Sequence, residues 1–219
     1  MSGALKFFVL VTAVSVCCGT VCSGQAQSGL PPDADSRSSL VEQDCGRKIY
    51  RGEYRNPERE YQVHLPKQVT AIACSESGFQ IYLIHPDSAG SEAKPGFSWS
   101  SIWVAGCSEP TNMTLLDIAD QWAQYQNDDS ERAYATDLQI DQPVQSSLSS
   151  LQAIKLRATR TEPKQGGLIY EVVVAKNPDN RAYVIEMVSL TSTYEKNHKL
   201  FQAVVEGFTY VPRNTRGEH

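Results

Sequence analysis

Apolar and polar residues alternate most clearly between positions 151 and 190. Two β-leaning runs, 168–176 and 181–190, flank Asn177-Pro178-Asp179-Asn180, a stretch of turn-forming residues. This pattern predicts a β-hairpin. If its turn is symmetric, apolar residues pair across it on one buried face. The predicted pairs are Val174 with Tyr183, Val172 with Ile185, and Tyr170 with Met187.

A third strand returns across residues 161–167 and places Leu156 beside Val172 on the same face. The opposite face then carries a row of charges: Arg157, Glu171 and Glu186. The two glutamates are predicted to lie directly opposite each other, where like charges repel. Two interpretations stay open. The row is either an ion network on the sheet surface or a carboxylate pair that binds a cation or a proton.

The rest of the chain also favours strands, with two helices. Thr114 and Asp117 have the spacing of a helix cap, followed by apolar residues at helical spacing up to Tyr125. Ser192 and Glu195 have the capping-box spacing for a second helix, which Gly207 ends. A short strand over 208–211 closes the domain. The β-leaning runs before the first helix are 48–55, 61–65, 69–73, 79–84 and 98–105. The predicted fold class is α+β, an antiparallel β-sheet covered by two main helices.

The first residues have the layout of a secretory signal peptide. Lys6 supplies a positive charge, residues 7–16 are almost all apolar, and small residues follow up to Ala26. The apolar run is shorter than the roughly 20 residues that a membrane-spanning helix needs. We therefore expect an exported protein, periplasmic or extracellular, with no stable membrane span after removal of the signal. Lipoprotein anchoring through Cys17, Cys18 or Cys22 is the alternative, although the residues before each cysteine fit that motif poorly.

The predicted organisation has four parts. Residues 27–44 are rich in Pro, Ser, Asp and Gly, which is typical of a disordered linker. The parts are a signal peptide over 1–26, the linker over 27–44, a single α+β domain over 45–212, and a flexible tail over 213–219.

Charge argues against nucleic acid as a partner. The formal charge is −5, and removal of a signal that carries Lys6 and no acidic residue makes it −6. A nucleic-acid-binding surface needs clustered Lys and Arg, whereas the basic residues here are scattered. A protein or small-molecule partner remains.

Three cysteines lie outside the signal: Cys45, Cys74 and Cys107. An oxidising destination favours pairing, and an odd number leaves one cysteine over. Cys74 and Cys107 both follow strand-like runs and form the candidate disulfide, while Cys45 lies near the linker. Three unbridged thiols are the alternative. The spacing of Cys and His does not match a zinc site.

No sequence motif of a known catalytic, cofactor or metal site occurs in the chain. We therefore expect no cofactor, and an accessory or binding protein rather than an enzyme. The alternative is a hydrolase or metal-dependent enzyme whose site forms from residues distant in sequence. Arg157, Glu171 and Glu186 are the candidate binding residues.

Two segments resemble a known family. Tyr54-Arg-Asn-Pro followed by Tyr61-Gln-Val-His-Leu-Pro66 is similar to the opening of PsbP-like domains, and the end from Phe201 to Phe208 is similar to their terminal helix. The resemblance covers about residues 48–212. Lys67 follows Pro66 here, where a Trp is common in the family. The resemblance implies an α/β/α sandwich with accessory or binding roles, and it transfers no functional residue.

Overall fold

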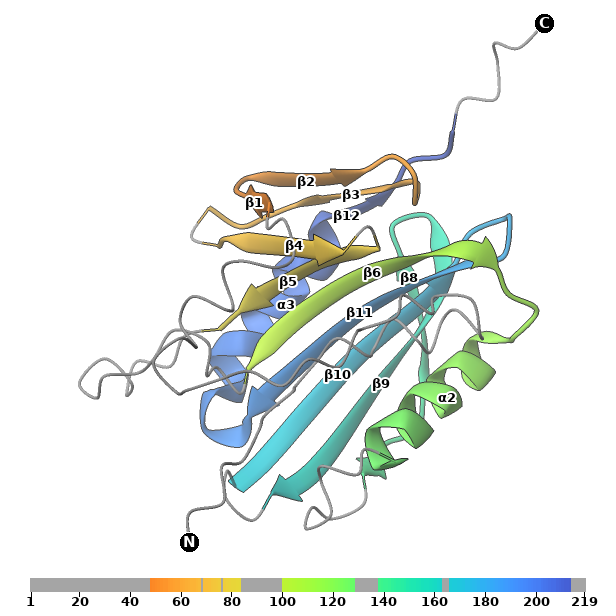
Figure 1. Ribbon diagram of the computed structural model, residues 1–219. Helices are drawn as coiled ribbons and strands as arrows, with labels where there is room; N and C mark the ends of the chain where they lie inside the picture. Colours follow the sequence, from red (N-terminus) through yellow and green to blue (C-terminus); the bar gives the residue numbers. More distant parts are fainter. Residues whose placement is uncertain are drawn as a thin grey trace, which may run out of the picture.

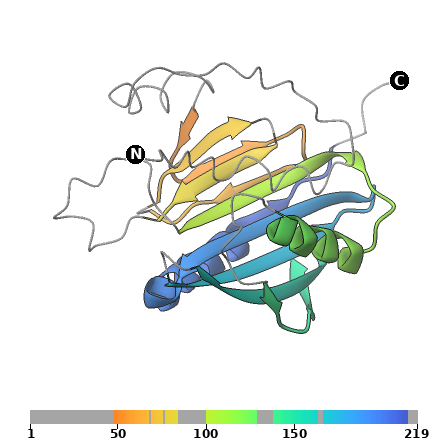
Figure 2. The same cartoon turned by 60° about the horizontal axis from the view of Figure 1, so that its bottom comes forward.

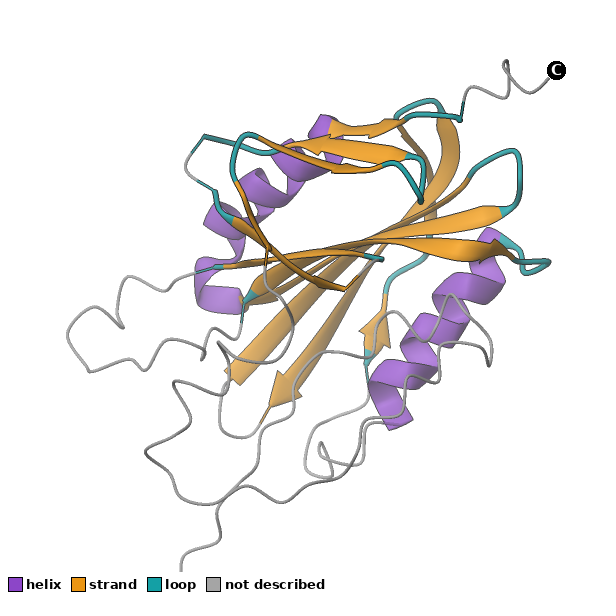
Figure 3. Ribbon diagram, turned by 45° about the horizontal axis from the view of Figure 1, so that its top comes forward, coloured by secondary structure: helices purple, strands orange, loops and turns teal. Residues whose placement is uncertain are grey.

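The computed structural model describes residues 48–67, 69–75, 77–83, 100–128, 138–162 and 166–213. These residues form three layers (Figures 1 and 2). A large antiparallel sheet lies in the centre, with α2 (Leu115–Asp128) on one face. The other face carries α3 (Tyr194–Gly207) and a small second sheet. Figure 3 shows the two helices on either side of the strands. The expected α+β fold class, an antiparallel sheet covered by two helices, is confirmed.

The large sheet contains nine strands among the described residues, and every pairing in it is antiparallel. In spatial order they are β1 (Lys48–Tyr50), β4 (Ala71–Ser75), β5 (Gly78–Tyr82), β6 (Ser101–Pro110), β11 (Arg181–Leu190), β10 (Gly166–Lys176), β9 (Leu151–Glu162) and β7 (Gln139–Ile140), with β8 (Val144–Leu148) also paired with β9.

The small sheet consists of β12 (Phe208–Tyr210), β3 (Tyr61–His64) and β2 (Glu53–Asn56). The sequence predicted one strand over 48–55, but this run is divided between the two sheets. Gly52 has a φ of 78°, a left-handed conformation that glycine adopts at little cost. The chain therefore turns at Gly52 and leaves the large sheet for the small one.

α2 begins as its sequence predicts. The Thr114 amide donates a hydrogen bond of 2.8 Å to the Asp117 carboxylate, and the Asp117 amide donates one of 3.1 Å to the Thr114 hydroxyl. This reciprocal pair satisfies amide groups that have no partner within the helix. The hydrogen bonds that the Thr114 amide and hydroxyl donate to the Asp117 carboxylate hold its pKa below the usual value. Ile118 and Trp122 lie buried on the face that packs on the sheet.

The turn between β10 and β11 sets the register of β11 against β10. The Asn180 amide donates to the Asn177 carbonyl at 2.9 Å, and the Asn177 amide donates to the Arg181 carbonyl at 3.0 Å. Asn180 itself has a φ of 62°. A turn followed by one left-handed residue adds a bulge residue to the hairpin. The predicted hairpin is therefore confirmed, but its turn is not symmetric.

This one extra residue makes the predicted register of β11 wrong. Val174 pairs with Val184 and not with Tyr183. Because side chains alternate in a strand, a shift of one residue moves each β11 side chain to the other face. The predicted pairing of β9 with β10 is confirmed, with Leu156 opposite Val172.

α3 begins and ends differently from the prediction. The predicted capping box of Ser192 and Glu195 is wrong, because a 3₁₀ turn over Thr191–Thr193 leads from β11 into the helix. Thr193 takes the cap position without a side-chain bond. Gly207 is the last helical residue, and a Cβ atom there would collide with the backbone carbonyl of His64. A glycine is needed because α3 crosses close to β3, and not because of its φ angle.

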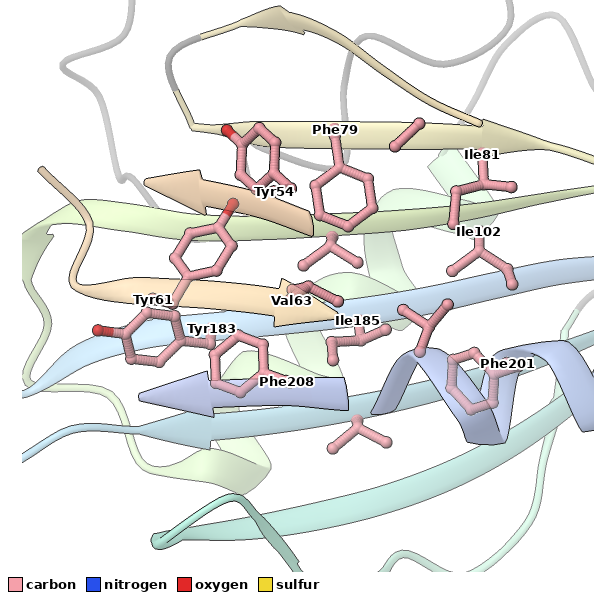
Figure 4. Packing of buried hydrophobic residues seen from close by; sticks show 14 of the residues in the cluster. Tyr54, Tyr61, Val63, Phe79, Ile81, Ile102, Tyr183, Ile185, Phe201 and Phe208 are labelled. Atoms are coloured by element: carbon pink, nitrogen blue, oxygen red, sulfur yellow. The ribbon is translucent and has the colours of Figure 1, made fainter. Parts of the chain in front are cut away.

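Apolar side chains fill both interfaces of the sheet. Between the sheet, α3 and the small sheet, aromatic rings such as Tyr61 and Phe208 stack at 5.4 Å (Figure 4). On the other face, Trp122 of α2 meets Tyr170 of β10 edge to face at 5.9 Å. Full burial of one such side chain contributes about 1.5–3 kcal/mol, so both layers are firmly held.

The strand order contradicts the predicted Cys74–Cys107 disulfide. Cys74 lies on β4 and Cys107 on β6, with β5 between them. Two strand spacings separate their backbones by about 9–10 Å. A disulfide needs Cα atoms about 4.4–6.8 Å apart. The predicted signal peptide, linker and Cys45 lie outside the described residues, as does the tail beyond Arg213.

Candidate functional site

Glu171 is a buried carboxylate on the α3 face of the sheet, with only 3% of its surface exposed. The Tyr194 hydroxyl donates a hydrogen bond of 2.6 Å to its Oε1 atom. Its Oε2 atom lies 2.9 Å from His198 Nδ1 and 3.4 Å from Lys155 Nζ. A carboxylate can only accept, so Nδ1 carries the proton in this contact. Both oxygens of Glu171 are therefore occupied by donors from α3 and β9.

Helical spacing brings two of these donors together. Tyr194 and His198 are four residues apart, so they lie one turn apart on the same face of α3. Their ring centroids are 5.3 Å apart, with the Tyr194 hydroxyl 3.5 Å from His198 Nδ1. Burial, followed by the hydrogen bond to Glu171, raises the pKa of Tyr194 to about 12. The hydroxyl thus keeps its proton and acts as a donor.

Arg157 is the exposed cation of this site. It lies directly opposite Glu171 on β9, as the sequence predicted. Its guanidinium stacks over the Tyr194 ring, 5.1 Å from the ring centroid. Among the described residues, no carboxylate lies within ion-pair distance of Arg157. Glu171 instead pairs with Lys155 and His198.

A hollow of about 350 Å³ lies beside Arg157. Its lining combines two arginines, three threonines, one amide side chain and a strip from the β10 strand, and the Arg160 side chain is bonded to the end of α2. The lining residues are Gln139, Arg157, Thr159, Arg160, Thr161, Gly167, Leu168, Ile169 and Thr191. Four elements therefore build the site: β9 supplies Arg157, β10 supplies the floor, β7 supplies Gln139, and the 3₁₀ turn before α3 supplies a wall.

Glu186 does not belong to this site. It pairs with Val172 across the hairpin and lies on the α2 face, because the bulge at Asn180 shifts β11 by one residue. It is buried, and the Gln126 amide of α2 donates a hydrogen bond of 3.3 Å to its Oε1 atom. The predicted row of Arg157, Glu171 and Glu186 is therefore wrong at its third member. The two carboxylates cannot share a cation, because the sheet separates them.

Arg160 forms a second polar contact on the α2 face. Its Nη2 atom donates to the Gln126 carbonyl at 2.6 Å and to Asn127 Oδ1 at 2.9 Å. These bonds fix the C-terminal end of α2 to β9. Sequence reasoning missed this contact. The available signal was that Arg160 shares its strand face with Leu156 and Ala158, which is unusual for a solvated cation.

Glu60 is a third buried carboxylate, and its role is structural. It accepts hydrogen bonds from Asn177 Nδ2 at 3.2 Å, from Arg181 Nη1 at 3.4 Å and from the Arg213 amide at 3.2 Å. These contacts join the turn after β2 to the turn after β10. Both oxygens of the Glu60 carboxylate therefore accept hydrogen bonds from within the protein.

Sequence reasoning also missed three residues of the Glu171 site: Lys155, Tyr194 and His198. The spacing of Tyr194 and His198 was visible as an i, i+4 pair, and Lys155 lies two residues before Arg157 on the same strand face. The sequence could not show that α3 would lie over Glu171.

In the part of the chain that the structure describes, no group of three or more His, Cys, Asp or Glu residues is arranged to hold a metal ion. None of the helices described is long and apolar enough to cross a membrane.

Comparison with solved structures returns proteins of similar fold. Cyanobacterial PsbP (CyanoP) from Synechocystis sp. PCC 6803 is 12% identical, with a TM-score of 0.47, over 76% of this chain and 93% of that protein. LpqN of Mycobacterium tuberculosis, involved in cell envelope biogenesis, is 10% identical, with a TM-score of 0.47, over 83% and 100%. The Ran-binding protein Mog1p of Saccharomyces cerevisiae is 15% identical, with a TM-score of 0.44, over 75% and 97%.

The first of these structures is a PsbP, and PsbP-like domains are the family that the sequence resembles. No protein-family model matches the sequence, and no curated protein matches it either.

Proposed function

We propose that this protein is an exported, non-enzymatic binding protein that holds an anionic group of its ligand at Arg157. The observation that carries the proposal is the state of Arg157. It is an exposed cation, stacked on Tyr194, without an ion-pair partner among the described residues, beside a polar hollow.

The arrangement around Glu171 explains why Arg157 is available. Glu171 is the nearest carboxylate in the register, opposite Arg157 on the next strand. Tyr194, His198 and Lys155 occupy its two oxygens. The carboxylate therefore does not neutralise Arg157, and the guanidinium donors remain for an external acceptor.

The guanidinium group suits a carboxylate or phosphate ligand. Its planar donors match two oxygens of such a group at once, which gives strong and directional hydrogen bonds. Stacking on the Tyr194 ring holds the side chain in one orientation before the ligand arrives. Less rotamer entropy is then lost on binding.

Export is the second part of the proposal, and the pattern of residues 1–26 supports it. The expected partner is a protein or small molecule outside the cytoplasm. The mass of the secreted protein tests this part. Removal of about 24–26 residues is the expected result, and retention of the N-terminus would contradict it.

A titration with small anions tests the binding proposal. Amide shifts of ¹⁵N-labelled protein are followed as sodium phosphate or sodium acetate is added at constant ionic strength. We expect shifts centred on Arg157, Thr159 and Thr191, and a loss of affinity of at least about fivefold in Arg157→Gln, as for loss of a charge-assisted hydrogen bond. Arg51→Gln is the matched control, because Arg51 is also exposed but lies by the opposite edge of the sheet. Equal affinity of Arg157→Gln and the parent protein would refute the proposal.

A second candidate function rests on the contact of Glu171 with His198. A buried carboxylate that accepts from Nδ1 orients the histidine so that Nε2 is left for proton transfer, as in hydrolases. Hydrolysis of p-nitrophenyl acetate tests this alternative. Turnover that is lost in His198→Ala but kept in His64→Ala, a variant of an exposed histidine, would favour the enzyme.

A further inference from the structure

The hollow beside Arg157 contains more than an anion site, and its other lining groups restrict the kind of ligand. Three threonines, Thr159, Thr161 and Thr191, line it together with the amide side chain of Gln139. Hydroxyl and amide groups both donate and accept hydrogen bonds. Such a lining suits a ligand that carries several hydroxyl groups.

The floor of the hollow is apolar. Ile169, which is 5% exposed, lies on the same side of β10 as the hollow, whereas the Leu168 side chain packs on the α2 face. Gly167 adds a strip of backbone without a side chain. A sugar ring has the matching character, because its C–H groups form an apolar face and its hydroxyls project around the rim.

Gly167 keeps the hollow open at its junction with the 3₁₀ turn. A Cβ atom at this position would collide with the hydroxyl oxygen of Thr191. A larger residue would therefore displace one of the lining hydroxyls. The volume of about 350 Å³ falls within the range of roughly 300–1,000 Å³ that is usual for small-ligand sites.

We propose that the ligand is a sugar acid, that is, a hydroxylated ring that carries a carboxylate. Arg157 binds the carboxylate, Thr159, Thr191 and Gln139 bind the ring hydroxyls, and the ring lies on Ile169 and Gly167. This inference rests on the proposed role of Arg157 as an anion site. It adds the chemical class of the rest of the ligand.

Neither part of the site binds a ligand as tightly as the two parts together. Phosphate or acetate engages Arg157 but does not engage the hydroxyls of Thr159 and Thr191. A neutral sugar engages the hydroxyls but leaves the guanidinium without an acceptor. Polar groups that are built to bind a hydroxyl discriminate strongly against an analogue that lacks it. A sugar acid therefore binds more tightly than either fragment.

Three probes separate these contributions: galacturonate, galactose and acetate. Binding to the purified protein is measured by amide shifts under identical buffer and ionic strength. We expect galacturonate to bind at least about tenfold more tightly than galactose or acetate, with an affinity near the millimolar range that is reasonable for so small a ligand.

Variants then show which side chain binds the carboxylate of the ligand and which binds its hydroxyls. Arg157→Gln is expected to reduce galacturonate binding to the level of galactose. Thr159→Val keeps the shape of the side chain but removes its hydroxyl, so it is expected to weaken galacturonate and leave acetate unchanged. Thr209→Val serves as the matched control, because Thr209 lies on β12 in the small sheet, away from the hollow.

The outcomes distinguish the two proposals. If galacturonate and acetate bind equally and both depend on Arg157, the sugar-acid inference is wrong and the anion site stands. If none of the probes depends on Arg157, both proposals are wrong. Trigalacturonate distinguishes the source of the ligand. Tighter binding than the monosaccharide indicates a polysaccharide, and equal or weaker binding indicates a free sugar acid.

Discussion

The hydroxyl of Tyr194 on α3 donates a hydrogen bond of 2.6 Å to the buried carboxylate of Glu171 on β10. This bond connects the helix to the sheet in the middle of the candidate site. It also places the Tyr194 ring under the Arg157 guanidinium, at 5.1 Å. The position of the exposed cation thus depends on a pair of groups that do not themselves line the hollow.

Because of this hydrogen bond, we expect the free energy of unfolding to fall at alkaline pH. The pKa of Tyr194 is raised from 10.0 to about 12, first by burial and then by Glu171. A group whose pKa is higher in the folded state stabilises the fold fully below its unfolded pKa. That contribution falls as the pH rises from about 10 to 12. We expect Tyr194→Phe to lose less free energy of unfolding across this interval than the parent protein.

Urea unfolding at several pH values measures this difference. Tyr61 and Tyr183 also have raised pKa values because of burial, so both proteins will lose some stability in alkali. Only the difference between them reports on Tyr194. Identical slopes would show that the hydroxyl does not keep its contact with Glu171 in solution.

Charge substitution at Glu171 and at Glu186 is expected to affect phosphate affinity differently, because the two residues lie on opposite faces of the sheet. Glu171→Gln removes a negative charge next to Arg157, so we expect phosphate affinity to rise by about fivefold, or about 1 kcal/mol for one charge at close range. Glu186→Gln changes the same kind of side chain on the α2 face and should leave phosphate affinity unchanged. Calorimetric titration of both variants checks this. An equal effect of the two would contradict the register of β11.

The turn residue Asn180 allows a test of that register by stability. Its φ of 62° lies in the left-handed region, which asparagine and glycine tolerate but β-branched residues do not. Asn180→Gly is expected to stay within about 0.5 kcal/mol of the parent protein, and Asn180→Val to lose about 1–2 kcal/mol. Thermal or urea unfolding provides the comparison. A tolerated valine would mean that the bulge is absent.

Gly207 and Gly167 differ in what an added methyl group would meet. At Gly207 the obstacle is the backbone of His64, which cannot move without shifting β3. At Gly167 it is the hydroxyl of the exposed Thr191, which can rotate away. We expect Gly207→Ala to cost about 1–3 kcal/mol, as for overpacking, and Gly167→Ala clearly less. Unfolding free energies of the two variants give the answer, and a Gly207→Ala protein of parental stability would contradict the close crossing of α3 and β3.

Some of the candidate site could be predicted from the sequence. The β9–β10 register followed from matching apolar residues, so the position of Arg157 opposite Glu171 was predicted correctly. The register of β11 was not, because it depends on the backbone conformation of Asn180. Both a symmetric turn and a turn with a bulge give apolar faces in this chain, since β11 has apolar residues on both sides. The hydrophobic pattern alone could not choose between them.

By itself the sequence determined the strands of the meander, the cap of α2, the closing strand and the α+β class, because these features depend on neighbouring residues and on the period of apolar positions. Only the tertiary structure decided which faces carry Glu171 and Glu186, and which residues surround them. Tyr194 and His198 meet Glu171 because α3 packs across β11 and β10, a contact between segments more than 20 residues apart. Such contacts depend on how whole layers pack, and the spacing of residues along the chain does not predict them.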